Sequence, residues 1–179
     1  MRFRAFLFIL AVLTSIQCSK KNTASPELSS VEDLIIKDNE ISGWRRAGEG
    51  WVVSSETDLY GKIDGAAPPY VQHGFVEAAD QNYSGKVLQD TVTVELKVFD
   101  QAKAANAQAL FAELAVNMIT PETWQTDKFQ EAKIERTQLS IRITGWKSKY
   151  YISLSITSNL NEALEVLKTF ATNVGSKIK

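Results

Sequence analysis

The side chains best suited to carry out chemistry lie in residues 58–75, "DLYGKIDGAAPPYVQHGF". This stretch contains His73, the only histidine of the chain, together with Asp58 and Asp64. Histidine changes charge near neutral pH and carboxylates accept protons, so these three residues could supply the acid–base chemistry of a hydrolase. No Gly-x-Ser-x-Gly motif supplies a nucleophile beside them. A hydrolase is therefore kept only as an alternative.

The same stretch also has a structural interpretation. His73 followed by Gly74 is typical of a helix C-terminus, where glycine adopts the left-handed conformation. Pro68 and Pro69 fit the first turn of a short helix ending at His73, and Asp64 could cap that helix. We favour this interpretation for His73.

Small residues between two tyrosines are what this interpretation leaves unexplained. Asp64, Gly65 and Ala66 lie between Tyr60 and Tyr70. Small side chains let a backbone approach either a ligand or a neighbouring helix, and tyrosines line a pocket or fill a core. These five residues are the candidate ligand- or partner-binding site. A pocket with Asp64 turned inward would favour binding, and a filled surface would favour a structural role.

The sequence lacks the residues that several functional classes require. One histidine and one cysteine are too few for a zinc site, so we expect no metal. No Gly-x-Gly-x-x-Gly motif follows a strand and no Walker A motif occurs, so we expect no cofactor. The net charge of −1 and the scattered basic residues argue against nucleic acid as a partner. We therefore predict no catalytic residues and a protein that is not an enzyme.

The N-terminus has the features of an export signal. Arg2 and Arg4 precede an uncharged run of twelve residues, 5–16, and the only cysteine follows as Cys18. The run is shorter than the roughly 20 apolar residues that span a bilayer, but it suits a signal peptide. "LTSIQC" resembles a lipobox in part, since Gln17 is bulkier than the usual residue. An ordinary secretory signal with an incidental cysteine is the alternative to a lipoprotein signal; we predict the lipoprotein signal, residues 1–18, with Cys18 lipidated.

Lipidation at Cys18 would anchor the chain stably, because each buried methylene contributes about 0.8 kcal/mol. Removal of the signal leaves 18 basic and 21 acidic residues, a net charge of −3. Residues 19–42 are polar at first and form the expected tether and lead-in, and residues 43–179 are long enough for one domain. The predicted localisation is the bacterial cell envelope, on the periplasmic side or at the outer membrane, with the membrane as a partner.

Hydrophobic periodicity predicts an α+β domain. Residues 91–98 alternate strictly between apolar and polar, and residues 139–146 and 149–158 form a predicted hairpin with its turn at "GWKS". Residues 101–118 and 159–178 have helical periodicity, the second with Asn159 as its cap and Glu162 completing a capping box. A further helix should start at Ser54 or Ser55. We expect a mainly antiparallel sheet with one wet face and both long helices on the other face, a sandwich of two or three layers.

The segment 43–114 resembles a family of bacterial exported proteins, domain of unknown function 6599. The matching residues are Gly43-Trp44, Leu59-Tyr60, Ile63-Asp64-Gly65-Ala66-Ala67, Tyr70, Gly74-Phe75 and Val98-Phe99-Asp100. Asp64 stands where the family pattern has asparagine, and two prolines replace less rigid residues. The resemblance implies export and a single α+β domain, and it implies no catalytic residues.

These observations predict a membrane-anchored lipoprotein whose domain is a non-catalytic binding or interaction module. Its partner would be an envelope protein or a small-molecule ligand, held by the segment around residues 58–75. A structural envelope lipoprotein without a ligand site is the alternative, and a hydrolase using Asp58, Asp64 and His73 is the other.

Overall fold

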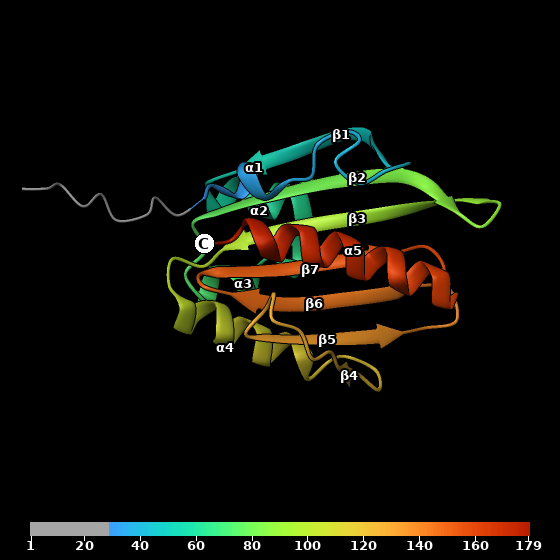
Figure 1. Ribbon diagram of the computed structural model, residues 1–179. Coiled ribbons are helices and arrows are strands. Elements are labelled where there is room, and N and C mark those ends of the chain that lie inside the picture. The colour runs from blue at the N-terminus through green and yellow to red at the C-terminus, as the bar shows by residue number, and fades with distance from the viewer. Residues whose placement is uncertain (1–28) are drawn as a thin grey trace, which may run out of the picture.

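Residues 29–179 are described by the computed structural model and form an α+β fold around one antiparallel sheet (Figure 1). The sheet has seven strands in the order β1-β2-β3-β7-β6-β5-β4, and each strand is antiparallel to its neighbours. The strands are β1 (Arg45–Val53), β2 (Glu77–Val87), β3 (Asp90–Asp100), β4 (Glu122–Thr123), β5 (Glu131–Arg136), β6 (Ile141–Lys147) and β7 (Tyr150–Ile156). The predicted α+β class with an antiparallel sheet is confirmed.

The helices connect the strands and lie on both faces of the sheet. They are α1 (Val31–Leu34), α2 (Glu56–Ile63), the 3₁₀ turn η1 (Asp64–Ala66), α3 (Pro68–Gln72), α4 (Ala104–Ala115) and α5 (Asn161–Lys177). None of the helices in this part of the chain is long and apolar enough to cross a bilayer.

The predicted hairpin is formed by β6 and β7, and its turn is shorter than expected. Lys147 pairs with Tyr150, so Gly145 and Trp146 belong to the strand and only two residues make the turn. Ser148, the first of these two, has a φ of +54°. Its amide donates to the Gln130 side-chain oxygen, which holds the turn in place.

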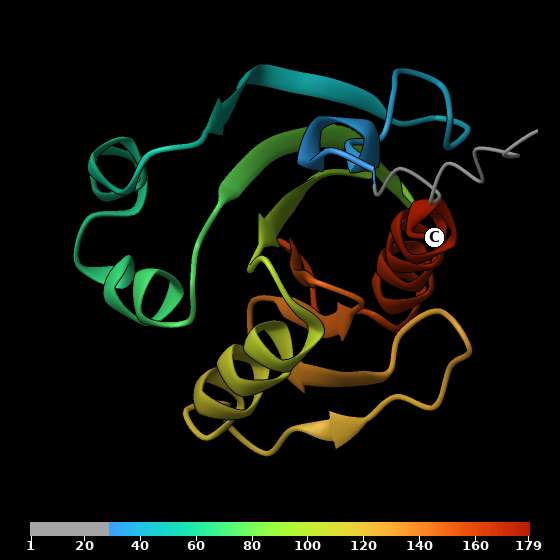
Figure 2. The ribbon, with the colours of Figure 1, turned by 90° about the vertical axis from the view of Figure 1, so that its left-hand side faces the viewer.

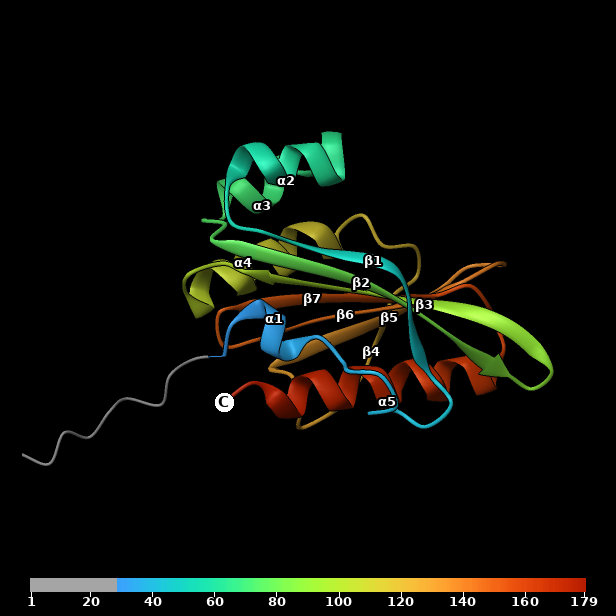
Figure 3. The ribbon, with the colours of Figure 1, turned by 90° about the horizontal axis from the view of Figure 1, so that it is seen from above.

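The expectation that both long helices share one face is wrong. α5 packs on the face that carries Val94, Leu96 and Val98, whereas α4 packs on the opposite face with α2 and α3 (Figure 3). The physical reason lies at one end of the sheet, where side chains on the second face are also apolar and need cover. They are Ala78, Phe99, Trp146 and Tyr151. The fold is therefore a three-layer arrangement with the outer layer on this second face incomplete.

The segment before β1 belongs to the packed domain, so the predicted boundary at residue 43 is too late. Val31, Leu34 and Ile36 are at most 1% exposed and lie in the same core as α5. The Tyr83 hydroxyl accepts from Ile36 N at 2.9 Å and donates to Ile36 O at 3.0 Å. The signal segment 1–18, with Cys18, and residues 19–28 of the tether lie outside the described residues.

Of the three predicted helix N-caps, the one at the start of α2 is confirmed. Ser55 caps α2 by accepting from Asp58 N, as expected. The predicted capping box at Asn159 and Glu162 is wrong, because α5 begins at Asn161 with Leu160 as its cap residue. The Asn159 amide instead donates to Gln138 O at 2.7 Å, which ties the start of α5 to the β5–β6 connection.

Candidate functional site

A groove crosses the second face of the sheet, the side on which α2, α3 and α4 lie (Figure 2). It consists of two cavities of about 530 and 300 Å³. Both are lined by Tyr70, Glu95 and Lys97, so they are neighbouring parts of one depression. The first reaches toward α2 and η1, and the second reaches toward the end of α4.

Strand register builds the floor of this groove from rows of side chains on adjacent strands. The innermost row is apolar and packs under the helices: Ala78, Phe99, Tyr151 and Trp146. The next row is polar: Asp80, Lys97, Ser153 and Thr144. The outer row is polar as well: Asn82, Glu95, Ser155, Arg142 and Glu135. The groove floor thus changes from apolar to charged within three rows.

Lys97 sits between two carboxylates in the centre of the floor. Its ammonium nitrogen lies 2.5 Å from a Glu95 oxygen and 3.5 Å from an Asp80 oxygen. Asp80 is 7% exposed, and this burial raises the pKa of its carboxyl, while the Lys97 charge opposes the increase. The three side chains form a compact charged group with its edges open to the groove.

Arg142 forms the second charged position of the floor. Its Nη1 lies 3.4 Å from Glu135, whose other carboxylate oxygen accepts from Ile119 N at 2.6 Å. Arg142 makes this one ion pair among residues 29–179, and it makes it through Nη1. The Nε and Nη2 donors of the guanidinium therefore remain available for hydrogen bonds. Half of the Arg142 side chain is exposed, so these donors can reach a bound molecule.

Two tyrosines connect the apolar and polar parts of the groove. Tyr70 stacks on Phe99 with ring centroids 4.1 Å apart and meets Tyr151 edge to face. Burial raises the pKa of Tyr70 to about 12 and also raises the pKa of Tyr151. Both phenols therefore stay protonated at neutral pH, and neither hydroxyl is hydrogen-bonded to another group among residues 29–179. Both side chains line the cavity next to α4.

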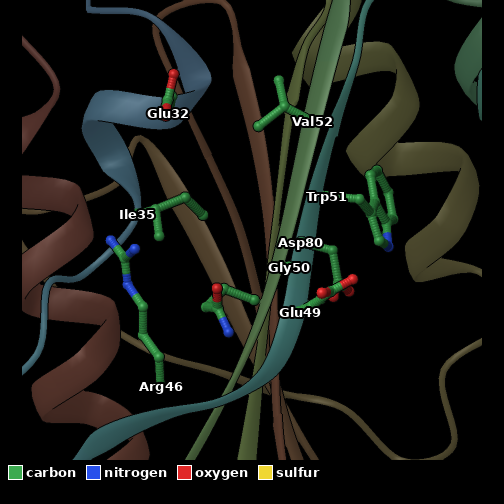
Figure 4. Close-up of a pocket in the computed structure, with 9 residues that line it drawn as sticks. Glu32, Ile35, Arg46, Glu49, Gly50, Trp51, Val52 and Asp80 are labelled. Atoms are coloured by element: carbon green, nitrogen blue, oxygen red, sulfur yellow. The ribbon is translucent and has the colours of Figure 1, made fainter.

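The bulged edge strand β1 forms the outer rim of the groove. The β1–β2 register shifts between Ala47 and Trp51, and Gly50 lies within the bulge. A Cβ on Gly50 would stand 2.6 Å from the Asp80 backbone oxygen, so a larger residue there would require the backbone to shift. A further cavity of about 350 Å³ lies at this edge. Figure 4 shows Trp51 and Asp80, which line it, on the other side of the strand from Arg46.

The structure separates the five predicted binding residues into two groups. Ala66 and Tyr70 line the groove. Tyr60 is 43% exposed, and Tyr60, Asp64 and Gly65 are not among the lining residues of either cavity. The prediction that Asp64 caps α3 is wrong: Asp64 ends α2 with a φ of +47°, and no side chain caps α3.

The hydrolase arrangement of Asp58, Asp64 and His73 is not formed. His73 Nε2 lies 2.7 Å from a Glu113 carboxylate oxygen of α4, and the Asp58 carboxylate accepts from Ser55 Oγ at 2.6 Å. His73 is the residue that ends α3, and Gly74 follows with a φ of +80°. The structural interpretation of His73 and Gly74 is therefore confirmed.

The charged floor residues were not identified as a site from the sequence. Glu95, Lys97 and Arg142 occupy the polar positions of strands that were predicted to have one wet face, and Asp80 was assigned to neither face. Within residues 29–179, no three His, Cys, Asp or Glu side chains converge as metal ligands would. What the groove offers chemically is a set of hydrogen-bond donors and acceptors beside aromatic rings.

Comparisons with known proteins give little further information. No family model matches the chain, and no curated protein matches it. Among solved structures, the extracellular domain of PknH from Mycobacterium tuberculosis is similar over 84% of this chain and 98% of that chain. The sequence identity is 10% and the TM-score is 0.49.

Proposed function

We propose that this protein is a lipid-anchored lipoprotein of the bacterial cell envelope whose domain binds a ligand in the groove between α3 and α4. The single observation that supports binding is the groove itself, with combined cavities in the size range of small-molecule sites. Charged and hydroxyl side chains from several strands and from α3 line it. The anchor rests on the signal features that end at Cys18, and the resemblance to domain of unknown function 6599 agrees with export.

The binding function can be tested by thermal unfolding in the presence of a filtered extract of cell-envelope small molecules. A ligand that binds only the folded state raises the melting temperature of the mature protein by mass action. Ser153→Trp fills the centre of the groove floor and should abolish the increase. Lys86→Trp introduces the same side chain at an exposed position of β2 outside the groove, and it should keep the increase.

Equal melting temperatures with and without extract would contradict ligand binding and favour the structural alternative. An increase of the same size in wild type and in Ser153→Trp would show that the ligand binds elsewhere. Circular dichroism of both tryptophan variants would establish that they fold.

A further inference from the structure

The charges that line the groove balance, and this balance restricts the class of ligand. Three carboxylates face three cations around the two cavities: Glu49, Asp80 and Glu95 against Lys62, Lys97 and Arg142. A ligand of strong net charge would gain attraction at one side and meet repulsion at the other. If the groove binds a ligand, as proposed above, its lining therefore favours a ligand without net charge.

Donors and acceptors also alternate over short distances on the floor. Glu95 and Asp80 accept hydrogen bonds on either side of Lys97, while the uncommitted Arg142 nitrogens and the protonated Tyr70 hydroxyl can donate. A long apolar chain laid over this floor would remove the charges from water without replacing their hydrogen bonds, at a large cost. A hydroxyl group both donates and accepts, so a ligand rich in hydroxyls can satisfy either kind of neighbour.

Aromatic rings stand at the edges of the same floor. Trp51 from the β1 bulge and Tyr70 from α3 both line the larger cavity. Trp51 and Tyr70 are both half-buried, and one face of the Tyr70 ring is covered by Phe99. The remaining aromatic surface offers apolar contact area, while the polar ends of the rings retain hydrogen-bonding capacity. A ligand that presents carbon-bound hydrogens on one face and hydroxyls around its rim matches this pairing of aromatic wall and polar floor.

We propose that the groove binds a short, uncharged oligosaccharide, with Asp80 and Glu95 accepting from its hydroxyls and Arg142 and Tyr70 donating to them. A pyranose ring has the two-sided character that the wall and floor require. The two connected cavities, of about 530 and 300 Å³, give the site the length for more than one ring. An extended peptide fits less well, since peptides that bind sheets pair with an edge strand through the main chain, whereas this floor is the side-chain face.

The experiment is a titration of the full mature lipoprotein, held in a detergent without a sugar headgroup, and followed by tryptophan fluorescence. The probes are maltotetraose, cellotetraose and chitotetraose, with tetraalanine and inorganic phosphate as probes of the competing ligand classes. We expect at least one tetrasaccharide to give a saturable change, because Trp51 lines the groove. Tetraalanine and phosphate should give none.

Matched variants assign the binding to the groove. Glu95→Gln and Tyr70→Phe each remove one hydrogen-bonding group with little change of shape, and each should weaken binding roughly tenfold. Glu122→Gln, an exposed position of β4, and Tyr60→Phe, an exposed position of α2, should leave binding unchanged. Melting temperatures of all four variants would separate loss of binding from loss of folding.

Each other outcome overturns the inference in a distinguishable way. Binding of tetraalanine or phosphate without any tetrasaccharide would replace the ligand class and keep the binding function. Saccharide binding that survives unchanged in Glu95→Gln and Tyr70→Phe would remove the site from the groove. No response to any tetrasaccharide would overturn the saccharide assignment, and the extract experiment would then decide separately whether the groove binds anything else.

Discussion

Gly74 lacks a side chain at the point where the chain leaves α3 and passes close to α4. It follows α3 with a φ of +80°, and a Cβ there would stand 2.7 Å from the Asn106 amide nitrogen of α4. That amide donates to Gln101 O at 2.8 Å, so it cannot move without losing a hydrogen bond. The residue therefore fixes the turn from α3 to β2 and the contact with α4 at the same time.

Gly74→Ala should lower the free energy of unfolding by about 1–2 kcal/mol from backbone strain alone, with the contact to Asn106 adding to that. Urea unfolding measures the change. Gly61→Ala is the matched control, because Gly61 lies inside α2 and a Cβ there meets no atom within 4 Å. That variant should instead gain about 0.5–1 kcal/mol of helix stability. Equal stabilities for the two variants would contradict this account of Gly74.

Asp80 links the groove floor to the pH dependence of stability. Burial raises the pKa of its carboxyl above the ordinary value of about 4. At a pH between the pKa of this carboxyl in the unfolded chain and its raised pKa in the folded protein, the folded protein holds a proton that the unfolded chain has released. The free energy of unfolding therefore decreases as pH increases through this range.

Asp80→Asn removes this titration, and the stability of the wild type relative to the variant should therefore decline from pH 4 toward pH 7. Urea unfolding at several pH values gives the comparison. Asp90→Asn changes an exposed carboxyl at the start of β3 and serves as the control. Parallel pH profiles for wild type and Asp80→Asn would show that the Asp80 carboxyl has the same pKa in both states.

At the scale of elements, the segment containing α1 is attached to the sheet by packing and by hydrogen bonds from side chains of β1 and β2, among them Arg46 and Tyr83. The buried Tyr83 hydroxyl satisfies both backbone groups of Ile36, while Val31, Leu34 and Ile36 fill the space beside α5. The helix itself is only four residues long, too short to be stable alone. Packing and these hydrogen bonds hold the segment in place.

Tyr83→Phe should cost about 1–3 kcal/mol, since it leaves the buried Ile36 N–H without a partner, while Ile36 O keeps the hydrogen bond from Arg46 Nε. Hydrogen exchange at the Ile36 amide should accelerate more than exchange in the β6–β7 hairpin. Tyr60→Phe removes an exposed hydroxyl and should change neither quantity. Uniform acceleration across the sheet would mean that the segment does not open separately.

Local sequence signals were enough for most elements and for the order of strands and helices. The alternation in β3, the two proline residues that open α3 and the glycine after His73 each act within a few residues, and the structure confirms them. The placement of α4 and α5 was wrong because the periodicity of one strand does not reveal which neighbours share its outward face. Only the pairing of β3 with β7, two strands distant in the sequence, brings Phe99 and Tyr151 into one apolar patch.

The candidate site was harder to predict for the same reason. Sequence reasoning concentrated on one continuous stretch and found two of the residues that line the groove, Ala66 and Tyr70. The charged floor comes from positions as distant as Asp80 and Arg142, which no spacing rule connects. Each of them alone has the features of an ordinary solvated strand residue.

At the scale of the whole molecule, the proposed anchor can be separated from the domain by one substitution. Cys18→Ala should release the protein from membranes or leave an unprocessed precursor, because the residue that receives the lipid is absent. Membrane fractionation with a measurement of mature chain length checks this. Normal maturation together with unchanged membrane association would contradict lipidation at Cys18. Ligand binding in the groove should persist in the released protein.

The start of the described chain and its C-terminal helix meet at one corner of the fold. Ser29 Oγ donates to Lys177 O at 3.4 Å, and the Lys177 ammonium donates to Ile35 O at 3.1 Å. Because Ser29 and Lys177 are in contact, the order in which the elements of residues 29–179 follow one another along the chain is not required by their final packing. A circular permutant that joins Lys179 to Ser29 through a short glycine-rich linker, and opens at the exposed β2–β3 turn beside Leu88, should fold to the same sheet. Its groove would then be available on a chain with both new ends at the far tip of the β2–β3 hairpin.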